Sequence, residues 1–185
     1  NAYNERNKGA YDKRAGFWKK LLAEISVKNA LEVGCNVAGN LRWMHPPVAL
    51  NHLYGIDINL DALKRLHEEF PAINAINAAA QDLPFKDNFF DLTFTTGVLI
   101  HQPEESVQQV MAELVRCSKK YVLCMEYFAE KTAEVPYRGN ERALFRRNYG
   151  AIYKKNHPNL QLAKEGYLSA EEGFDRITWW LFEKH

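Results

Sequence analysis

The chain has 185 residues, of which 46% are hydrophobic and 25% charged, and its formal net charge is +1. This length fits one domain with a hydrophobic core of its own, and the near-zero charge gives no support to general nucleic-acid binding. No apolar run approaches the roughly 18 residues of a membrane span, and the polar start NAYNERNKGAYDKR predicts no signal peptide. Three scattered cysteines without a CxxC pair indicate neither a disulfide framework nor a metal site. We therefore expect a reduced, cytoplasmic protein that holds no metal.

Strand-like and helix-like segments alternate over roughly the first two thirds of the chain. A helical stripe spans residues 8–26, GNLRWM opens a second helix that Pro46 and Pro47 stop, and DALKRLHEEF forms a third. In residues 103–117 the apolar side chains recur at helical spacing, and Pro103 suits the first turn of that helix. The strands expected between these helices are ALEVGC, HLYGIDI, INAINA, FDLTFTTGVLI and KYVLCMEYF.

The last part of the chain breaks this alternation. After a helix expected over residues 141–156, only SAEEGFDR separates the strands LQLAKEGYL and ITWWLFEK. This connection is too short for a helical crossover, so the two strands should pair antiparallel. The final strand is apolar on both faces, which favours a place inside the sheet. The sequence therefore predicts an α/β fold with a doubly wound, mostly parallel sheet that ends in an antiparallel hairpin.

A glycine-containing loop follows the first strand. Gly34, Asn36 and Gly39 nearly spell the dinucleotide fingerprint G-x-G-x-x-G, and Asp57 ends the second strand 23 residues after Gly34. An acid at that place can bind ribose hydroxyls. Asn36 tolerates a left-handed backbone, but its side chain would hinder the close approach of a pyrophosphate. The pattern favours a nucleoside ligand without phosphates; the alternative is a tight turn with a solvated Asp57.

Further polar residues follow the ends of other strands. Glu32, just before the loop, suits a ligand with a cationic end better than a pyrophosphate. Gln81 and Asp82 follow the third strand and could read the amino group of an adenine, unless they belong to an ordinary loop. The residues expected along the crevice beyond the fourth strand are Thr96, Gly97 and His101.

Taken together, LEVGCNVAGNL, YGIDIN, QDLPFKDNFFDLTFTTGVLIH and the terminal hairpin resemble a class I S-adenosylmethionine-dependent methyltransferase over nearly the whole chain. More narrowly, AYNERN, LEVGCN, GVLIHQPEE, RCSKKYVL, EYF, EVPYRG and LFRRNYG resemble the pseudaminic acid biosynthesis-associated methylase group. The wider resemblance implies a Rossmann-like sheet of seven strands in the order 3-2-1-4-5-7-6, within one domain over residues 1–185. We expect an N-terminal helical cover over residues 1–28 and a substrate-side insertion over residues 129–157.

The resemblance also implies which residues hold S-adenosylmethionine and its product S-adenosylhomocysteine. The glycine loop would contact the methionine part, Asp57 the ribose, and Asp82 with the backbone of Leu83 the adenine. The expected cofactor-binding residues are Tyr3, Arg6, Glu32, Gly34, Asn36, Gly39, Asp57, Ile58, Gln81, Asp82, Leu83, Thr96 and Gly97. One position departs from the family pattern, because Ala38 stands where a third glycine is usual and Gly39 follows one place later.

The cofactor's carboxylate would be covered by the N-terminal segment. Tyr3 and Arg6 provide a Tyr-x-x-Arg spacing, and Tyr11 and Arg14 repeat it. The sequence leaves open which of the two pairs performs this role.

The acceptor side of the site rests on fewer signals. His101 is the candidate general base, because a histidine titrates near neutrality; an equal alternative is that it caps or orients the following helix. The two residues that end the fifth strand could bind the acceptor or simply close the strand. The basic segment 135–155 should act as a substrate lid, in which Arg138 recognises an anionic acceptor. The expected substrate-binding residues are His101, Glu126, Tyr127, Tyr137 and Arg138.

We therefore expect a methyltransferase that acts on oxygen or nitrogen of a small, anionic or sugar-like metabolite, such as a nucleotide sugar or an acidic sugar. Three alternatives stay open. They are an NAD-dependent oxidoreductase with the same glycine loop, a module that binds the cofactor without turnover, and a protein methyltransferase. We expect neither a nucleic-acid nor a membrane partner, and a monomer or homodimer.

Overall fold

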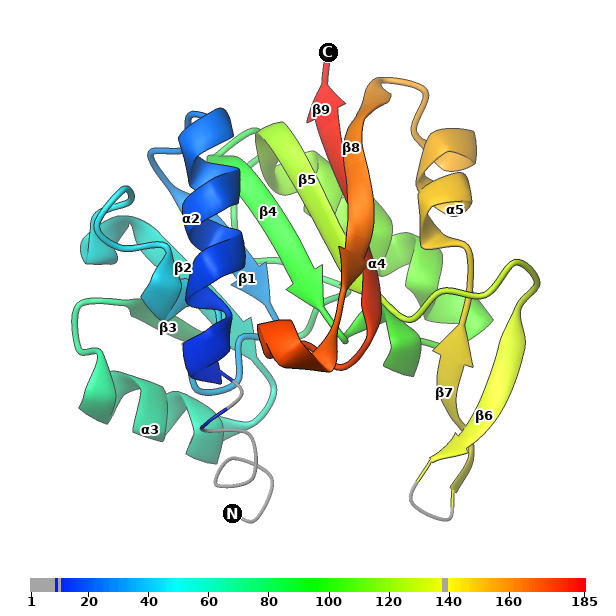
Figure 1. Cartoon of the computed structure of the whole chain (residues 1–185), viewed down its shortest axis with the longest axis horizontal. Coiled ribbons are helices and arrows are strands. Elements are labelled where there is room, and N and C mark those ends of the chain that lie inside the picture. Colours follow the sequence, from blue (N-terminus) through cyan, green and yellow to red (C-terminus); the bar gives the residue numbers. More distant parts are fainter. Residues whose placement is uncertain (1–8, 10, 138–139) are drawn as a thin grey trace.

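The computed structural model describes residue 9 and the ranges 11–137 and 140–185. Its main body is an open sheet of seven strands in the order β3-β2-β1-β4-β5-β9-β8 (Figure 1). These strands are β1 (Ala30–Val33), β2 (Leu53–Asp57), β3 (Asn74–Asn77), β4 (Phe90–Thr96), β5 (Ser118–Glu126), β8 (Leu160–Leu168) and β9 (Ile177–Lys184). Strands β1 to β5 run parallel, and β9 runs antiparallel to both β5 and β8. The predicted strand order and the C-terminal antiparallel hairpin are confirmed.

Helices cover both faces of this sheet. They are α2 (Ala15–Glu24), α3 (Leu60–Glu69), α4 (Glu104–Cys117) and α5 (Tyr149–Asn156), with the short 3-10 turns η1 (Leu41–Trp43), η2 (Leu50–His52), η3 (Leu99–His101) and η4 (Ala170–Glu172). In Figure 1, α2 crosses the front of the sheet and α4 lies behind it. Within the described ranges, no helix has both the length and the apolar character that crossing a bilayer requires.

Alternate side chains of the strands point to opposite faces and build two hydrophobic cores. Trp18 of α2 belongs to the core on one face, and Val110 of α4 belongs to the core on the other. Strand β9 contributes to both, because Leu181 packs into the first core and Phe182 into the second. Its apolar pattern on both faces therefore matches its observed place between β5 and β8.

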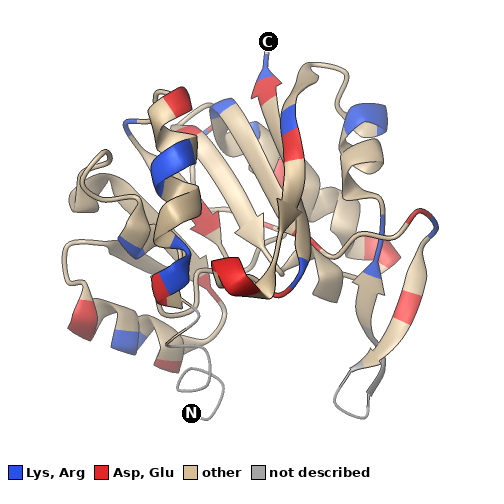
Figure 2. Cartoon of the chain, viewed as in Figure 1, with Lys and Arg blue, Asp and Glu red and all other residues tan. Residues whose placement is uncertain are grey.

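Charged residues lie mainly on the helices, loops and sheet rims, and the broad faces of β4 and β5 carry few of them (Figure 2). Two acids depart from this surface distribution of charge. Glu32 on β1 and Glu126 at the end of β5 are almost completely buried. Burying an unpaired carboxylate is costly. Each of these two acids therefore requires a specific structural or functional explanation.

The prediction of a helix at GNLRWM is wrong. This segment forms only η1, and Leu41 and Met44 at its ends are fully buried. Because Pro46 and Pro47 follow at once, too few residues remain to propagate an α-helix.

The helix expected over residues 141–156 is wrong in its first part. Strand β7 (Asn140–Arg146) pairs antiparallel with β6 (Ala133–Tyr137) in a separate two-stranded sheet, the β6–β7 hairpin. Helix α5 begins only at Tyr149, where Oδ1 of Asn148 accepts the backbone N–H of Ala151 at 3.0 Å. Asparagine is a preferred residue at this capping position, so Asn148 stabilises a helix that begins at Tyr149. The hairpin and α5 occupy the segment between β5 and β8.

Candidate functional site

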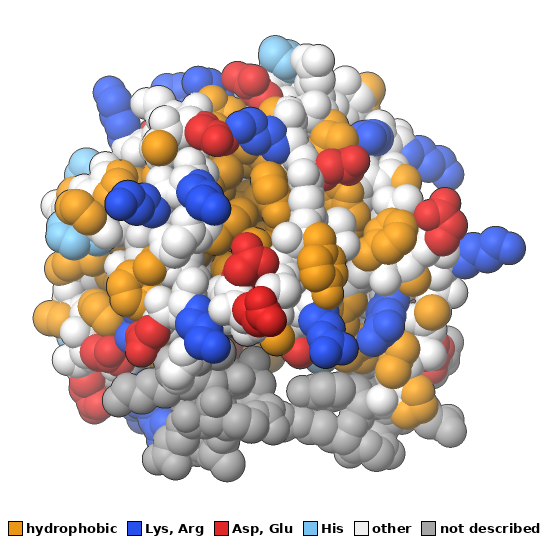
Figure 3. All heavy atoms as spheres, viewed as in Figure 1, with side chains coloured by type: hydrophobic (Ala, Val, Ile, Leu, Met, Phe, Trp, Pro, Cys, Tyr) orange, Lys and Arg blue, Asp and Glu red, His pale blue; other side chains and the backbone are white. Residues whose placement is uncertain are grey.

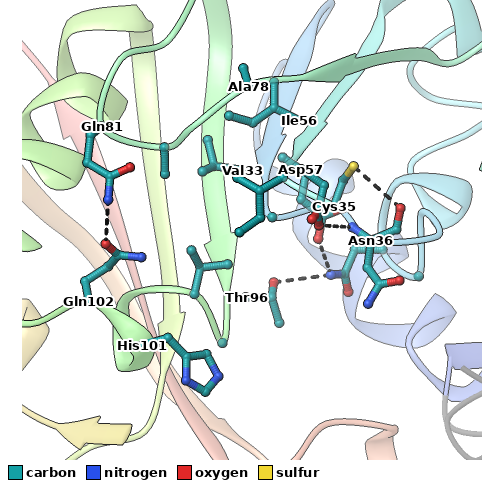
Figure 4. Close-up of a pocket in the computed structure, with 18 of the residues that line it drawn as sticks. Val33, Cys35, Asn36, Ile56, Asp57, Ala78, Gln81, Thr96, His101 and Gln102 are labelled. Carbon is teal, nitrogen blue, oxygen red and sulfur yellow. Dashed lines mark hydrogen bonds between the residues drawn. The ribbon is translucent and has the colours of Figure 1, made fainter. Parts of the chain in front are cut away.

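A pocket of about 390 Å³ opens at the carboxyl ends of β1, β2 and β4 (Figure 4). Ligands bind at this edge in open α/β sheets, and small-molecule pockets usually measure roughly 300–1,000 Å³. The expected residues that line this pocket are Glu32, Gly34, Asn36, Gly39, Asp57, Ile58, Gln81, Thr96, Gly97 and His101. The sequence thus identified the location of the pocket and most of its polar lining.

The glycine loop after β1 forms one wall. Gly34, Asn36 and Ala38 have φ angles of +76°, +49° and +59°, all in the left-handed region. The left-handed backbone expected at Asn36 is therefore confirmed. A Cβ added to Gly34 would lie only 2.3 Å from Cγ2 of Val98, so glycine is needed for the loop to pack against the turn after β4. Ala38 adopts the same left-handed conformation although it is not a glycine. This conformation costs an L-residue about 1–2 kcal/mol.

Asp57 is held in place by two backbone donors. Its Oδ2 accepts the N–H of Asn36 at 2.9 Å, and its Oδ1 accepts the N–H of Asn59 at 2.9 Å. These two bonds fix the plane of the carboxylate at the pocket wall. Each oxygen retains a lone pair for one more donor, so the carboxylate can accept hydrogen bonds from two neighbouring hydroxyl groups of a ligand.

Glu32 on β1 has an exposed fraction of only 2%. Its Oε1 accepts a hydrogen bond from Nδ2 of Asn40 at 2.6 Å, whereas its Oε2 has no hydrogen-bond partner among the residues that the structure describes. Burial raises the pKa of Glu32 to about 8, and the Asn40 hydrogen bond, the charge of Arg14 and the backbone N–H of Leu41 oppose this rise. A buried carboxylate oxygen without a partner in a pocket wall suits a cationic group of a ligand.

Asn40 and Arg14 complete this end of the pocket. Nη1 of Arg14 donates to Oδ1 of Asn40 at 3.0 Å, and Nε of Arg14 donates to the carbonyl of Gly173 at 2.9 Å. Nδ2 of Asn40 also donates to Oγ1 of Thr96 at 3.2 Å. Asn40 was not expected from the sequence, in which its only signal is its place directly after Gly39.

The structure bears on only one of the two Tyr-x-x-Arg pairs. Tyr11 and Arg14 both line the pocket, whereas Tyr3 and Arg6 lie outside the described residues. Of the expected acceptor residues, Arg138 also lies outside the described residues. The roles expected for these three residues stay predictions.

Two glutamines meet at the side of the pocket that lies away from Asp57 in Figure 4. Nε2 of Gln81 donates to Oε1 of Gln102 at 2.9 Å, and both residues line the pocket. The side chain of Ile58, 77% exposed, adds an apolar surface to the lining. Gln102 was not expected, because only the histidine before it has a side chain that titrates near neutrality.

Asp82 and Leu83 are not among the residues that line the pocket. Asp82 is exposed, and the backbone N–H of Leu83 donates to Oε2 of Glu113 at 2.8 Å. That N–H is therefore already occupied by a protein acceptor. The adenine contacts expected of these two residues stay predictions.

The turn after β4 forms a further wall. Gly97 has a φ angle of +66° and its N–H donates to the carbonyl of Met125 at 2.9 Å, which turns the chain out of the sheet. His101, at the end of η3, is exposed and lines the pocket. Figure 4 shows its imidazole beside the pocket, below Thr96. A side chain at this place can reach a bound ligand, while its role as a base stays a prediction.

Glu126 does not line the pocket. Its carboxylate is fully buried and accepts the backbone N–H groups of Val98, Leu99 and Ile100 at 3.1, 3.1 and 3.2 Å. Burial raises the pKa of Glu126 to about 7, against the lowering effect of these hydrogen bonds. These contacts give Glu126 a structural use, and the acceptor contact expected for it stays a prediction.

Tyr127 also lies outside the pocket lining. Its hydroxyl donates to Oδ2 of Asp175, and the guanidinium of Arg146 lies 5.6 Å from the centre of its ring. Tyr127 thus connects the end of β5 to the loop before β9. It also contacts the β6–β7 hairpin, because Arg146 is the last residue of β7. The acceptor contacts expected for Tyr127 and Tyr137 stay predictions.

A second hollow, of about 490 Å³, lies between α2 and β8. Its lining includes Phe17 and Trp179, and Lys164 forms an ion pair with Glu24 at its side. Figure 3 shows hydrophobic side chains among basic and acidic ones on this face. This hollow has neither the glycine loop nor the acid at a strand end, so we place the candidate site in the first pocket.

Comparison with known proteins gives a family for the sequence. A family model described as a methyltransferase domain matches residues 31–125, about half of the chain. This range begins in β1 and includes the glycine loop, Asp57 and the turn after β4. A Haemophilus influenzae protein, described only as uncharacterized, is 26% identical over 158 residues. The match covers 81% of this chain, and the chain spans only 59% of the length of that relative.

Comparison with solved structures shows the same fold at low identity. The Burkholderia thailandensis 1,6-didemethyltoxoflavin-N1-methyltransferase, with 1,6-didemethyltoxoflavin and S-adenosylhomocysteine bound, has a TM-score of 0.72 at 9% identity, over 95% of this chain and 78% of that one. The Synechocystis PCC 6803 magnesium protoporphyrin IX methyltransferase with S-adenosylhomocysteine has a TM-score of 0.70 at 15% identity, over 94% and 84%. A chain of a Haloferax volcanii complex between the Trm112 methyltransferase activator and a candidate methyltransferase has a TM-score of 0.72 at 14% identity, over 99% and 95%.

Proposed function

The chain belongs to the methyltransferase domain family, and on that premise we propose that it is an enzyme that transfers a methyl group to oxygen or nitrogen of a small, anionic or sugar-like metabolite. The methyl donor is S-adenosylmethionine, and the pocket at the ends of β1, β2 and β4 is its site. Two solved neighbours with this fold carry S-adenosylhomocysteine, the product of such a reaction.

The observation that carries this proposal is Oε2 of the buried Glu32, which has no hydrogen-bond partner within the described part of the chain. The ammonium group of the methionine tail is a cation of the right chemistry to pair with it. Arg14, which lines the same end of the pocket, supplies a positive charge for the carboxylate of that tail. A pyrophosphate would instead bring two negative charges beside Glu32, which disfavours NAD as the ligand.

Asp57 suits the ribose of the same ligand. Its carboxylate is oriented by the N–H groups of Asn36 and Asn59, and it retains acceptor capacity for two hydroxyl groups. The side chain of Asn36 fills space that close contact with phosphate would require, in agreement with a nucleoside without phosphates. Ile58 would pack against the base, and the side-chain amide of Gln81 would meet its polar edge.

The bound cofactor supplies an activated methyl group on a sulfonium, so the protein has chiefly to hold the acceptor in line with that methyl. An acceptor hydroxyl or ammonium must also lose a proton. His101 lines the pocket and is exposed to solvent, so it can accept that proton and release it to water.

An anionic acceptor agrees with two exposed arginines around Tyr127, neither of which lines the pocket itself. The exposed side chain of Arg146 lies over the ring of Tyr127, and the exposed Arg176 follows Asp175, which bonds to the hydroxyl of the same tyrosine. Guanidinium groups bind carboxylates and phosphates with two parallel hydrogen bonds. The resemblance to the pseudaminic acid biosynthesis-associated group favours an acidic sugar or a nucleotide sugar as the acceptor.

The proposal is tested by incubating the purified protein with S-adenosylmethionine that carries a radiolabelled methyl group and with a panel of nucleotide sugars and acidic sugars. We expect label in the small-molecule fraction with one acidic member of the panel, and none with uncharged sugars. Label in added cell protein rather than in any small molecule would overturn the proposed acceptor class and favour a protein methyltransferase.

A further inference from the structure

The turn from Val98 to Gln102 is held at its beginning by a buried carboxylate. Glu126 has no exposed surface, and its two oxygens together accept three consecutive backbone N–H groups, which belong to residues 98, 99 and 100. The first N–H groups of a helical turn have no partner within the turn and carry partial positive charge. The two carboxyl oxygens of Glu126 therefore satisfy all three of these donors at once.

The end of the same turn is held by a buried guanidinium. Arg147 has an exposed fraction of 1%, and its Nη1 donates to the carbonyl of Gln102 at 2.9 Å. Its guanidinium lies 4.4 Å from the centre of the Phe145 ring, and its Nε lies 3.5 Å from Oε2 of Glu104. The last carbonyl groups of a helical turn carry partial negative charge. The positive guanidinium of Arg147 therefore stabilises this end of the turn.

From this arrangement we propose that Glu126 and Arg147 form a clamp, the Glu126–Arg147 clamp, that positions His101 and Gln102 for the reaction. Both clamped residues line the pocket, whereas neither member of the clamp does. Burying a guanidinium and an ionisable carboxyl group is costly, and each of them is hydrogen-bonded here to one end of the same short turn. The clamp residues are positioning residues, and this inference rests on the proposed use of the pocket for S-adenosylmethionine.

The clamp also connects the pocket to the β6–β7 hairpin. Arg147 directly follows β7, its N–H donates to the carbonyl of Tyr127, and its carbonyl accepts the N–H of Ala129, both at 3.4 Å. Strand β7 packs against η3. A movement of the hairpin would therefore move the guanidinium that holds Gln102, so that the segment between β5 and β8 is coupled to the geometry of the pocket wall.

Hydrogen–deuterium exchange with mass spectrometry tests the clamp directly in the full chain. We expect Arg147→Met and Glu126→Gln to speed exchange in the peptide over residues 97–102 by about tenfold or more, the effect of losing one hydrogen bond to a charged group. Peptides from β1 and β9 should exchange at the wild-type rate. Lys155→Met, which removes an exposed charge from α5, should change neither region.

Unchanged exchange over residues 97–102, or equally faster exchange throughout the sheet, would overturn the clamp. Should Arg147→Met fail to fold, Glu126→Gln and Arg147→Lys decide the same question. Arg147→Lys keeps a buried donor for Gln102 and should restore most of the protection.

Binding of S-adenosylhomocysteine to the same variants, measured by titration calorimetry, tests whether the clamp serves the pocket. We expect both clamp variants to lose about tenfold in affinity, with Lys155→Met as wild type. Wild-type affinity in folded clamp variants would contradict the positioning role. If the wild-type protein itself did not bind this ligand, the proposed function would fail, and the exchange data would still decide whether the clamp exists.

Discussion

Glu32 has a carboxylate with one oxygen bonded to Asn40 and one without a partner among the described residues. Glu32→Gln keeps the volume and removes the charge that would pair with a ligand ammonium. We expect this variant to bind S-adenosylhomocysteine at about pH 8 at least about tenfold more weakly than wild type, the usual loss for a charged hydrogen bond. Titration calorimetry measures this, with Glu165→Gln as a matched control because Glu165 is exposed on β8.

The same residue should make binding depend on pH. Since burial raises the pKa of Glu32 to about 8, its carboxyl group is mostly protonated at about pH 6 and must release a proton before it pairs with an ammonium. The affinity of the wild type should therefore rise by up to about tenfold per pH unit between pH 6 and pH 8. The affinity of Glu32→Gln should stay nearly constant over this range. An equally steep rise in the variant would remove Glu32 from the ligand contact.

At the scale of elements, the seven-stranded sheet could be predicted because the patterns that indicate its strands and helices each lie within one short segment of sequence. Buried strands are short apolar runs, the clearest helices have 3.6-residue periodicity, and the short connection SAEEGFDR excludes a crossover. The β6–β7 hairpin was missed because its strands pair with each other outside the main sheet. Their side chains therefore do not repeat the apolar pattern of a core strand.

The candidate site was predictable to a similar extent. Gly34, Asn36 and Asp57 belong to a pattern with fixed spacing, so the sequence located them. The pairing of Gln81 with Gln102 joins two loops 21 residues apart, and no local pattern indicates such a contact. The burial of Glu126 also depends on the packed fold, which is why its three backbone bonds were not foreseen.

Two glycines in different elements should respond in opposite ways to the same substitution. In Gly34→Ala the new Cβ meets Cγ2 of Val98 at 2.3 Å and the φ angle of +76° is unfavourable, so stability should fall by about 1–3 kcal/mol. In Gly16→Ala, inside α2, the Cβ meets nothing within 4 Å, so stability should rise by about 0.5–1 kcal/mol.

The stabilities of Gly34→Ala and Gly16→Ala are compared with the wild type through their midpoints of thermal unfolding, measured by calorimetry. For a chain of this length each kcal/mol moves the midpoint by about 2–4 °C. A midpoint for Gly34→Ala equal to the wild type would show that the loop and the turn after β4 are not packed as described.

At the scale of the whole molecule, the two buried acids should make the ligand-free protein less stable as the pH rises. Burial raises the pKa of Glu32 to about 8 and that of Glu126 to about 7, from an ordinary 4.5. The folded state therefore holds these two protons more tightly than the unfolded state, and stability is lost as the pH rises from about 4.5 through these values. Each group accounts for at most about 1.4 kcal/mol per pH unit.

The loss of stability caused by ionisation of Glu32 and Glu126 is best measured between about pH 6.5 and pH 8. The pKa of His157 is lowered from 6.5 by burial, so the stability associated with this histidine rises with pH mainly below the window and levels off within it. We expect the unfolding midpoint of the wild type to fall across the window, and that of Glu32→Gln to fall less. A midpoint that rises over this range in the wild type would contradict the assignment of buried, protonated carboxyl groups.

The measurement that tests the central claim most directly is thermal unfolding of the purified protein with S-adenosylmethionine, S-adenosylhomocysteine or NAD, each in large excess. A ligand at about 100 times its Kd adds about 2.7 kcal/mol of stability, which for this length raises the midpoint by about 5–10 °C. We predict this rise with both sulfur ligands and no rise with NAD. A rise with NAD alone would contradict the methyltransferase site and the ligand contacts assigned to Glu32 and Asp57.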